Sequence, residues 1–449
     1  MLDTAASANA CLRPLGPRFA FGYTREGSAR SCIPRVISEE DNPVRHISWP
    51  RPVLTEATQR ATLFEIFFDL VYVFALTRVI AFMGHPLTPL TLAQGLILLL
   101  LFWVTWTNYT WLGNQARADL GPVAAGTTLA MAAIFVAALV IPDAWQHGAT
   151  TTGARLTLAL AYIIPTALHL TLYFYAATGD RQLHTTLGIY ATAVALAWIP
   201  LVLGAVLGGT AQTLLWAAAF LINFTGGGVL ASRVSGWPVR SPSHFTERHG
   251  LVLIIALGES LVSVGVGAEP AVTHAPVLVA ALLAFTSTVC LWWLYFKRSA
   301  SAAGVALARA STKRRNQAAV NAYSWAHIAL IAGVIYIALG IEQVLVHLTH
   351  NQPRHAAGTP LDWTSTLALY GGAFLYLAGR VTFLRFTVRS TPPGHLVAPG
   401  VALLLLPAAR ILPALAALGL LTVFLVALVV YEWLGGREQD PTADETTKL

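Results

Sequence analysis

The chain has 449 residues, of which 56% are apolar and only 11% are charged, and its formal net charge is +7. Soluble proteins carry about 25% charged residues, so a water-soluble fold could not cover this much apolar surface. The basic excess fits the loops of a membrane protein and does not indicate a nucleic-acid partner. Cys11, Cys32 and Cys290 show neither a disulfide-framework spacing nor a zinc-site spacing, and we predict no cofactor.

Residues 1–58 contain seven arginines among prolines and serines, without an apolar run long enough for a signal peptide. This composition is typical of a disordered segment, and we expect a basic tail on the cytoplasmic side. An over-extended reading of the start site would account for part of its length. Residues 436–449 are predicted to form a second, polar tail.

Between the tails, over residues 59–435, windows of about twenty residues with hardly a charge recur, as a hydrocarbon layer about 30 Å thick requires of spanning helices. We therefore predict an all-α bundle of about twelve transmembrane helices embedded in the lipid bilayer of the plasma membrane. The eleventh is short and interrupted by prolines. The predicted spans are 62–83, 90–111, 120–141, 155–177, 184–207, 210–231, 249–267, 275–296, 321–348, 361–386, 396–412 and 413–434.

The basic residues alternate along the loops, and this alternation sets the predicted orientation. The tails and the loops that follow even-numbered spans hold 23 lysines and arginines, whereas the loops that follow odd-numbered spans hold three. Because cytoplasmic loops are the basic ones, both termini are predicted to lie in the cytoplasm.

Short similar segments in the two halves of the chain suggest an internal repeat of six plus six helices. An acid lies inside the first span and another inside the seventh, in similar strings, DLVYV from Asp69 and ESLVSV from Glu259. The second and eighth spans both end in aromatic clusters. Chance similarity between two apolar segments is an equal alternative at this length.

Ionisable residues inside spans are the main functional candidates, because a charge at the bilayer centre costs about 2.5–3.5 kcal/mol even on a lenient scale. Glu65 and Asp69 lie four residues apart and therefore on one face of the first span. Two adjacent carboxylates ionise together only at a cost, so one is expected to keep its proton, as a proton relay or cation site could use. The alternative is that Glu65 is hydrated near the cytoplasmic end or paired with Arg60.

The seventh span carries a second group of candidates. Glu259 and Ser260 lie about ten residues inside it. Gly258 and Gly265 are spaced so that a neighbouring helix could approach closely. The predicted cytoplasmic entrance to this span has a spacing that matches no zinc motif, so pairing at the interface is favoured over a metal site. The entrance residues are His244, Glu247, Arg248 and His249.

Further candidates lie in the fourth, ninth and tenth spans. His169 and His327 are relay candidates, although a histidine bonded to a neighbouring helix is more common. Arg380 lies deep enough in the tenth span to need an acidic partner. The resulting ion pair would either take part in function or only hold helices together. Three acids qualify as the partner of Arg380: Asp69, Glu259 and Glu342.

Other features of the sequence are explained without a catalytic site. Tryptophans near span ends, among them Trp111, Trp145 and Trp293, fit the aromatic belt of membrane proteins. The sequence has no phosphate-binding loop, nucleophile elbow or HExxH motif. The longest loop after the N-terminal tail, 297–320, is too short for a catalytic domain. We therefore predict that the protein is not an enzyme.

Several blocks of the sequence resemble the low temperature requirement protein A (LtrA) family of bacterial membrane proteins. Residues 61–77 (ATLFEIFFDLVYVFALT) are similar to its opening helix, and residues 244–262 (HFTERHGLVLIIALGESLV) to its central signature. Residues 291–296, 322–327 and 340–342 resemble later blocks, so that the likeness extends from about 45 to 435. The resemblance implies a multi-span membrane protein without an assigned substrate or reaction. It places these residues in signature blocks: Glu65, Asp69, His249, Glu259, His327 and Glu342.

The leading hypothesis from the sequence is a secondary transporter or permease for an unidentified small solute, with proton or ion coupling. Acids on three spans, the suggested repeat and the lack of a nucleotide-binding motif favour it. One alternative is an ion channel, because the string from Phe68 and Asp69 faintly resembles an FSDG-containing helix of a potassium-channel family. Another is a membrane-embedded enzyme acting on lipids through His249, Glu247 and Glu259.

Overall fold

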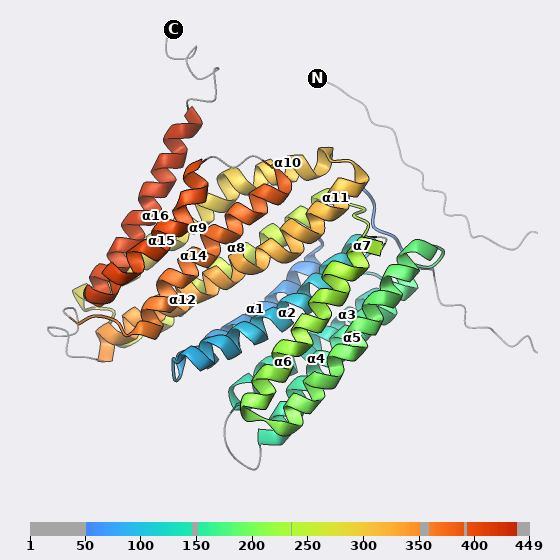
Figure 1. Ribbon diagram of the computed structural model, residues 1–449, viewed down its shortest axis with the longest axis horizontal. Coiled ribbons are helices and arrows are strands. Elements are labelled where there is room, and N and C mark those ends of the chain that lie inside the picture. Colours follow the sequence, from blue (N-terminus) through green and yellow to red (C-terminus); the bar gives the residue numbers. More distant parts are fainter. Residues whose placement is uncertain (1–50, 146–150, 235, 351–358, 390–392, 438–449) are drawn as a thin grey trace, which may run out of the picture. The chain divides into compact units, whose positions relative to one another are not determined.

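The computed structural model describes residues 51–145, 151–234, 236–350, 359–389 and 393–437. Over these residues the chain is helical, with two isolated β-bridges and no strand, which confirms the predicted all-α class. Twelve helices in this part of the chain are long and apolar enough to cross a membrane, the number expected. Figure 1 colours the helices in chain order.

The helices agree with the predicted spans in order and in approximate position. The eleventh, α15, is an uninterrupted helix although it contains Pro399 and Pro407. The bounds are α1 Leu63–Gly84, α2 Pro89–Gln115, α3 Gly121–Val140, η1 Ile141–Asp143, α4 Thr151–Ala176, α5 Arg181–Leu207, α6 Gly209–Asn223, η2 Phe224–Ala231, α7 Ser232–Val234, α8 Pro242–Ala268, η3 Glu269–Ala271, α9 Ala275–Trp293, η4 Leu294–Ala300, α10 Ser301–Arg309, α11 Thr312–Ala318, η5 Ala319–Ala326, α12 His327–His350, α14 Trp363–Thr387, α15 Pro393–Ile411 and α16 Ala414–Arg437.

Helix α8 begins at Pro242, seven residues before the predicted start of its span at 249. The hydroxyl of Ser241 accepts a hydrogen bond from the N–H of His244 at 3.2 Å, and a proline follows directly, which are common features of a helix start. The predicted entrance segment is therefore the first two turns of a helix. This places the side chains of Arg248 and His249 inside the bundle.

The segment 297–320, expected to be the longest loop, is helical almost throughout. Helices η4 and α10 continue the eighth span to Arg309, and α11 opens the ninth. Hydropathy detects only the apolar part of such a helix, whereas the alanine-rich sequence beyond it also favours a helix. The turn between the two helices is held by Arg315, whose guanidinium donates to the carbonyls of Leu307, Ala308 and Ala310.

Corresponding helices make corresponding contacts in the two halves of the chain. Helix α1 packs on α2 and α3, and α8 packs on α9 and α12. Helix α4 packs on α3 and α5, and α14 packs on α12 and α15. Helix α6 packs on α5 and α2, and α16 packs on α15 and α9. The first helices of the halves, α1 and α8, also pack on each other. These contacts agree with a six-plus-six repeat, which stays a prediction, and others, such as that of α2 with α4, have no counterpart of similar size.

Glycines bring α12 and α14 into backbone contact. A Cβ on Gly340 would lie 2.7 Å from the backbone of Leu369, and one on Gly372 would lie 2.7 Å from the backbone nitrogen of Ile337. Small residues are the usual means of such close approach in membrane proteins. The prediction that Gly258 and Gly265 serve this purpose is wrong, because a Cβ on either would meet nothing within 4 Å on the outer face of α8.

The last residues of the predicted N-terminal tail are ordered against the end of α2. The N–H of Thr55 donates to the Gln115 carbonyl at 3.2 Å, and the N–H of Arg117 donates to the Val53 carbonyl at 2.8 Å. The expected boundary at residue 58 therefore falls after an ordered segment. The rest of this tail, residues 1–50, and most of the predicted C-terminal tail, residues 438–449, lie outside the described residues.

The predicted orientation can be tested with two exposed threonines on opposite sides of the bundle. Thr178 follows the fourth span and Thr273 follows the seventh. In a background with Cys11, Cys32 and Cys290 replaced by serine, a membrane-impermeant maleimide should label Thr273→Cys in intact cells. Thr178→Cys should react only after permeabilisation, because basic loops are retained in the cytoplasm. The reverse pattern would contradict the orientation.

Candidate functional site

Four of the predicted site residues meet in one buried cluster between α1 and α8. Glu65 and Asp69 share a face of α1, and they are 4% and 0% exposed. Arg248 Nη1 lies 2.8 Å from Asp69 Oδ2 and donates to the Glu65 carbonyl at 2.6 Å. His244 Nε2 lies 2.8 Å from Glu65 Oε1. The cluster joins the two helices through groups that lipid cannot solvate.

The cluster extends to α2 through Trp106, whose indole N–H donates to Asp69 Oδ1 at 2.8 Å. Arg248 also lies over this indole, 5.6 Å from the ring centroid. Gly113 on the same helix leaves room for Glu65, because a Cβ at this position would overlap the carboxylate. Arg248 lies beside both carboxylates, 2.8 Å from Asp69 Oδ2 and 3.9 Å from Glu65 Oε1, and a cation at this place favours their charged forms. That one of the two acids keeps a proton stays a prediction.

The remaining entrance residues have separate partners. Glu247 Oε1 lies 2.9 Å from Arg60 Nη2. The alternative that Glu65 pairs with Arg60 is therefore wrong. His249 is fully buried, and its Nδ1 lies 2.8 Å from a backbone carbonyl of its own helix. His244, Glu247 and His249 thus face different groups, and the described residues contain no cluster of three such side chains that could hold a metal ion.

His249 and His327 lie side by side although they come from different spans. Their ring centroids are 5.1 Å apart. His327 Nε2 lies 2.7 Å from the hydroxyl of Tyr295, and the ring of Tyr323 stacks on His327 at 5.2 Å. His327 is therefore bonded to Tyr295 of the eighth span.

Glu259 and Glu342 are the predicted acids without an arginine or lysine beside them, although His85 is close enough to Glu342 for their charges to interact. The hydroxyl of Thr77 is within hydrogen-bonding reach of Glu259. Glu342 lies beside Gly84 at the end of α1, close enough to Glu259 for their charges to interact. Neither acid forms an ion pair with any described residue. Ser260, next to Glu259, donates to the Leu257 carbonyl of its own helix at 2.6 Å.

Arg380 is paired with Glu432, which was not among the predicted partners. The two side chains form a bidentate pair, with distances of 2.6 Å and 2.7 Å from the guanidinium nitrogens to the carboxylate oxygens. Arg380 Nε also donates to Ser299 Oγ at 2.9 Å, and His395 Nε2 lies 3.1 Å from Glu432 Oε1. The expectation that Asp69, Glu259 or Glu342 pairs with Arg380 is wrong. The pair joins α14 to α16, η4 and α15.

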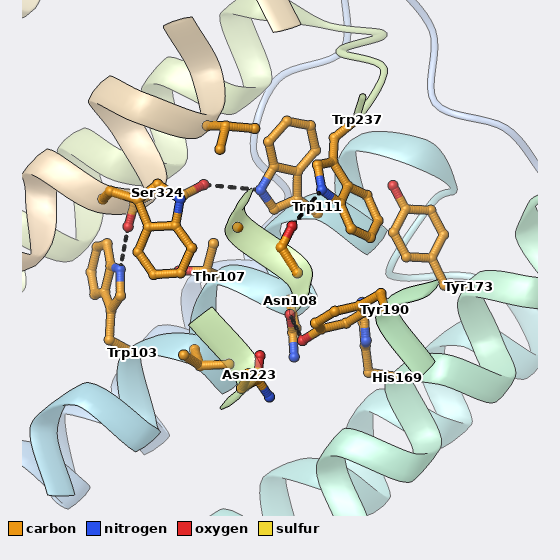
Figure 2. A pocket seen from close by; sticks show the side chains of 15 residues that line it. Trp103, Thr107, Asn108, Trp111, His169, Tyr173, Tyr190, Asn223, Trp237 and Ser324 are labelled. Atoms are coloured by element: carbon orange, nitrogen blue, oxygen red, sulfur yellow. Dashed lines mark hydrogen bonds between the residues drawn. The ribbon is translucent and has the colours of Figure 1, made fainter. Parts of the chain in front are cut away.

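A cavity of about 50 Å³, which we call the aromatic cavity, lies between α2, α4, α5 and the π-helical turns η2 and η5. Figure 2 shows Trp103 and Trp111 both directed at Ser324. Trp103 Nε1 donates to the Ser324 carbonyl at 2.6 Å, and Trp111 Nε1 donates to the Ser324 hydroxyl at 3.0 Å. Trp111 is therefore a buried wall residue, and its assignment to the aromatic belt is wrong. Single π-helical turns inside helices are frequent at functional sites.

Several polar atoms on the cavity wall are buried without a hydrogen-bond partner among the described residues. They are Thr107 Oγ1, Asn108 Nδ2, both ring nitrogens of His169 and the hydroxyl of Tyr173. The other amide atom of Asn108 accepts from the hydroxyl of Tyr190 at 2.7 Å (Figure 2). Because about 90% or more of buried polar groups are paired, a group of unpaired ones around one cavity indicates a place for water or a ligand.

A wider and more polar hollow of about 1060 Å³ adjoins this cavity. The two share the wall residues Gly228, Trp237 and Val320. The wall of the wider hollow, which we call the vestibule, carries Arg233 and Lys313 and, within the described residues, no acid. It lies among the basic segments that are predicted to face the cytoplasm.

His169 is the predicted site residue that lines this cavity, and sequence reasoning missed the others. The prediction considered ionisable residues inside spans, whereas the wall uses amides, hydroxyls and indoles. Asn108 and Asn223 lie inside the predicted second and sixth spans, so uncharged polar residues within spans were the available signal. Trp237 lies outside the spans and carried no such signal.

Twelve apolar helices in the described part of the chain, with buried ion pairs that join different helices, define a multi-pass membrane protein. The description of the family whose sequence model matches residues 60–430 is bacterial low temperature requirement A protein (LtrA), and the chain belongs to this family. The chain is also 26% identical over 393 residues to an uncharacterized protein of Rhizobium meliloti (strain 1021). That match covers 83% of this chain and 88% of the relative.

Glu432→Gln should destabilise the protein strongly, because it leaves Arg380 as a buried cation without its counter-charge. Removing one partner of a buried pair costs about 3–5 kcal/mol, whereas replacing both with apolar residues is often neutral. We expect a marked fall in Tm in detergent for Glu432→Gln and recovery in Arg380→Met/Glu432→Leu. Asp119→Asn, which breaks the partly exposed Arg117 pair, should change Tm little. Equal shifts for the two single variants would contradict a buried pair.

Proposed function

We propose that this protein is a secondary transporter of the plasma membrane whose substrate site is the aromatic cavity. The observation that carries the proposal is the set of unpaired polar atoms around that cavity beside the basic vestibule. A site inside the bundle that is reached from one side at a time is what a carrier needs. The matching helix contacts of the two halves support this, because many transporters are built from repeats.

Glu259 and Glu342 are the proposed coupling residues. An acid inside the membrane is costly, so it is retained either in a pair or for a function. Glu65, Asp69 and Glu432 are held by Arg248, His244 or Arg380, whereas Glu259 and Glu342 form no ion pair within the described residues. His85 is the base whose charge reaches Glu342, and the two acids also act on each other. Without an arginine partner, these two acids can exchange a proton or bind a small cation.

The ninth span connects the two proposed sites. Its first part, η5, carries Ser324 at the cavity wall, and its continuation, α12, carries Glu342. A displacement of this span would change both sites together. Such mechanical connection is the basis of coupling between a substrate and an ion.

The contacts of Asp69 and Glu247 favour a carrier over the two alternatives. A channel like the FSDG type would need the Phe68 and Asp69 segment to face a pore, but Asp69 is held by Arg248 and Trp106. A lipid enzyme using His249, Glu247 and Glu259 would need these groups at one centre, but Glu247 pairs with Arg60 at the surface.

Transport can be tested by reconstituting the purified protein in liposomes with a trapped pH-sensitive dye. A panel of organic acids, amines, sugars and amino acids is added under an imposed pH gradient. We expect at least one compound to drive protein-dependent proton movement, and Glu259→Gln and Glu342→Gln to reduce it about tenfold or more, as loss of an essential carboxyl does. Glu269→Gln is the matched control, because Glu269 is exposed at the end of the same helix as Glu259.

Two results would count against the proposal. Wild-type protein that moves protons with no compound of the panel would contradict transport. Flux that persists unchanged in both glutamine variants would contradict the coupling role of Glu259 and Glu342.

A further inference from the structure

We propose that the aromatic cavity binds a small organic anion, with its acid group at the unpaired donors of the cavity wall and a flat unsaturated body among the tryptophans, and that the basic vestibule attracts this anion. This inference rests on the proposed function in taking the cavity as the substrate site. It adds the chemical class of the substrate, and it follows from the charge, shape and hydrogen-bonding capacity of the wall.

The charges around the site favour an anion. Arg233 and Lys313 line the vestibule, and within the described residues no acid lines either hollow. Arg240 and Asp180 are the charged groups whose fields reach Tyr173 at the cavity wall. Asp180 is exposed and caps α5 through the N–H of Leu183. A cleft lined by one sign of charge concentrates ligands of the opposite sign.

The wall favours a flat ligand. Trp237 stacks on Tyr173 with ring centroids 5.8 Å apart and an interplanar angle of 29°, and it lies 6.1 Å from Trp111. One water molecule needs about 10–15 Å³ of cavity volume, so the volume of about 50 Å³ holds three to five water molecules. A ligand with an aromatic ring would therefore extend from the cavity into the part shared with the vestibule.

The unpaired wall atoms match the oxygens of a carboxylate. Asn108 Nδ2 can only donate, because the Oδ1 of the same amide already accepts from Tyr190. The hydroxyls of Thr107 and Tyr173 can donate as well, and neutral His169 has one donor. Hydrogen bonds from neutral donors to an ionised acceptor are shorter and stronger than those to a neutral one.

The ligand class can be tested by direct binding to the full-length protein in nanodiscs, without transport. Radiolabelled benzoate is bound at neutral pH and displaced with unlabelled benzoate, benzamide, benzylammonium or cyclohexanecarboxylate, which differ in head group or in flatness. We expect saturable benzoate binding, with benzamide and cyclohexanecarboxylate about tenfold weaker as competitors and benzylammonium inactive. Tighter binding of benzylammonium than of benzoate would overturn the proposal. If none of the four compounds binds saturably, water is the occupant of the cavity, and this result would also overturn the proposal.

A matched pair of tyrosines on α4 tests where the ligand lies. Both Tyr173 and Tyr162 have buried hydroxyls without a partner among the described residues, but only Tyr173 lines the cavity. Tyr173→Phe should weaken benzoate binding about three- to tenfold, the effect of one lost hydrogen bond, and Tyr162→Phe should leave it unchanged. Equal effects of the two substitutions would exclude the cavity as the binding site.

A second pair tests the vestibule. Arg233→Gln and Lys313→Gln should weaken benzoate binding most at low ionic strength, because salt screens these charges. Arg309→Gln, an exposed residue of α10 that lines neither hollow, is the control and should have no effect. Binding that is independent of salt and of both vestibule residues would contradict the proposed attraction of the anion by the vestibule.

The binding and flux experiments separate the two proposals. Benzoate binding that Tyr173→Phe weakens, in a protein that moves no proton with any compound, supports the ligand class and contradicts the transporter. Proton movement driven by an amine, without benzoate binding, supports the transporter and contradicts the ligand class.

Discussion

The buried guanidinium of Arg248 is the charge on which the arrangement of α1, α2 and α8 depends. It is only 1% exposed, so bulk water does not reach it to replace a lost partner, and its charge depends on the contacts with Asp69 and the Glu65 carbonyl. Trp106 bonds the same Asp69 and stacks on Trp103 at 4.9 Å. Trp103 lines the aromatic cavity. The ion pair therefore also sets the position of one wall of the candidate site.

Buried polar groups in this protein fall into two sets with different consequences. The first set is paired across helices, as in Arg248 with Asp69 and Arg380 with Glu432, and it specifies which helices meet. The second set forms no ion pair within the described residues and includes Glu259, the half-buried Glu342 and the unpaired polar atoms of the cavity wall. A membrane bundle gains no stability from groups of this second kind, which is why we assign function to them.

The sequence predicted the helices well, because a spanning segment must be apolar over its whole length and this constraint is local. It also predicted that Glu65 and Asp69 share a helix face, which needs only the helical period. It could not predict the partner of Arg380, since a pairing depends on packing between distant spans. A comparison of how far each charged residue lies from the end of its span would have indicated the partner of Arg380. Arg380 and Glu432 both lie near the ends of spans that finish on the basic side. The cavity was missed because neutral amides and indoles carry little signal in a hydropathy pattern.

The pairing of Arg380 with Glu432 also has a consequence for biosynthesis. Glu432 follows Arg380 by 52 residues, so α14 is made before its counter-charge in α16 exists. Until the last helix enters the membrane, the guanidinium of Arg380 lacks the acid that neutralises it in the finished bundle. In a chain without α16, this cation would lie in the bundle without its counter-charge, at a cost that α16 removes. The contact of α14 with α16 can therefore form only after α16 has been inserted.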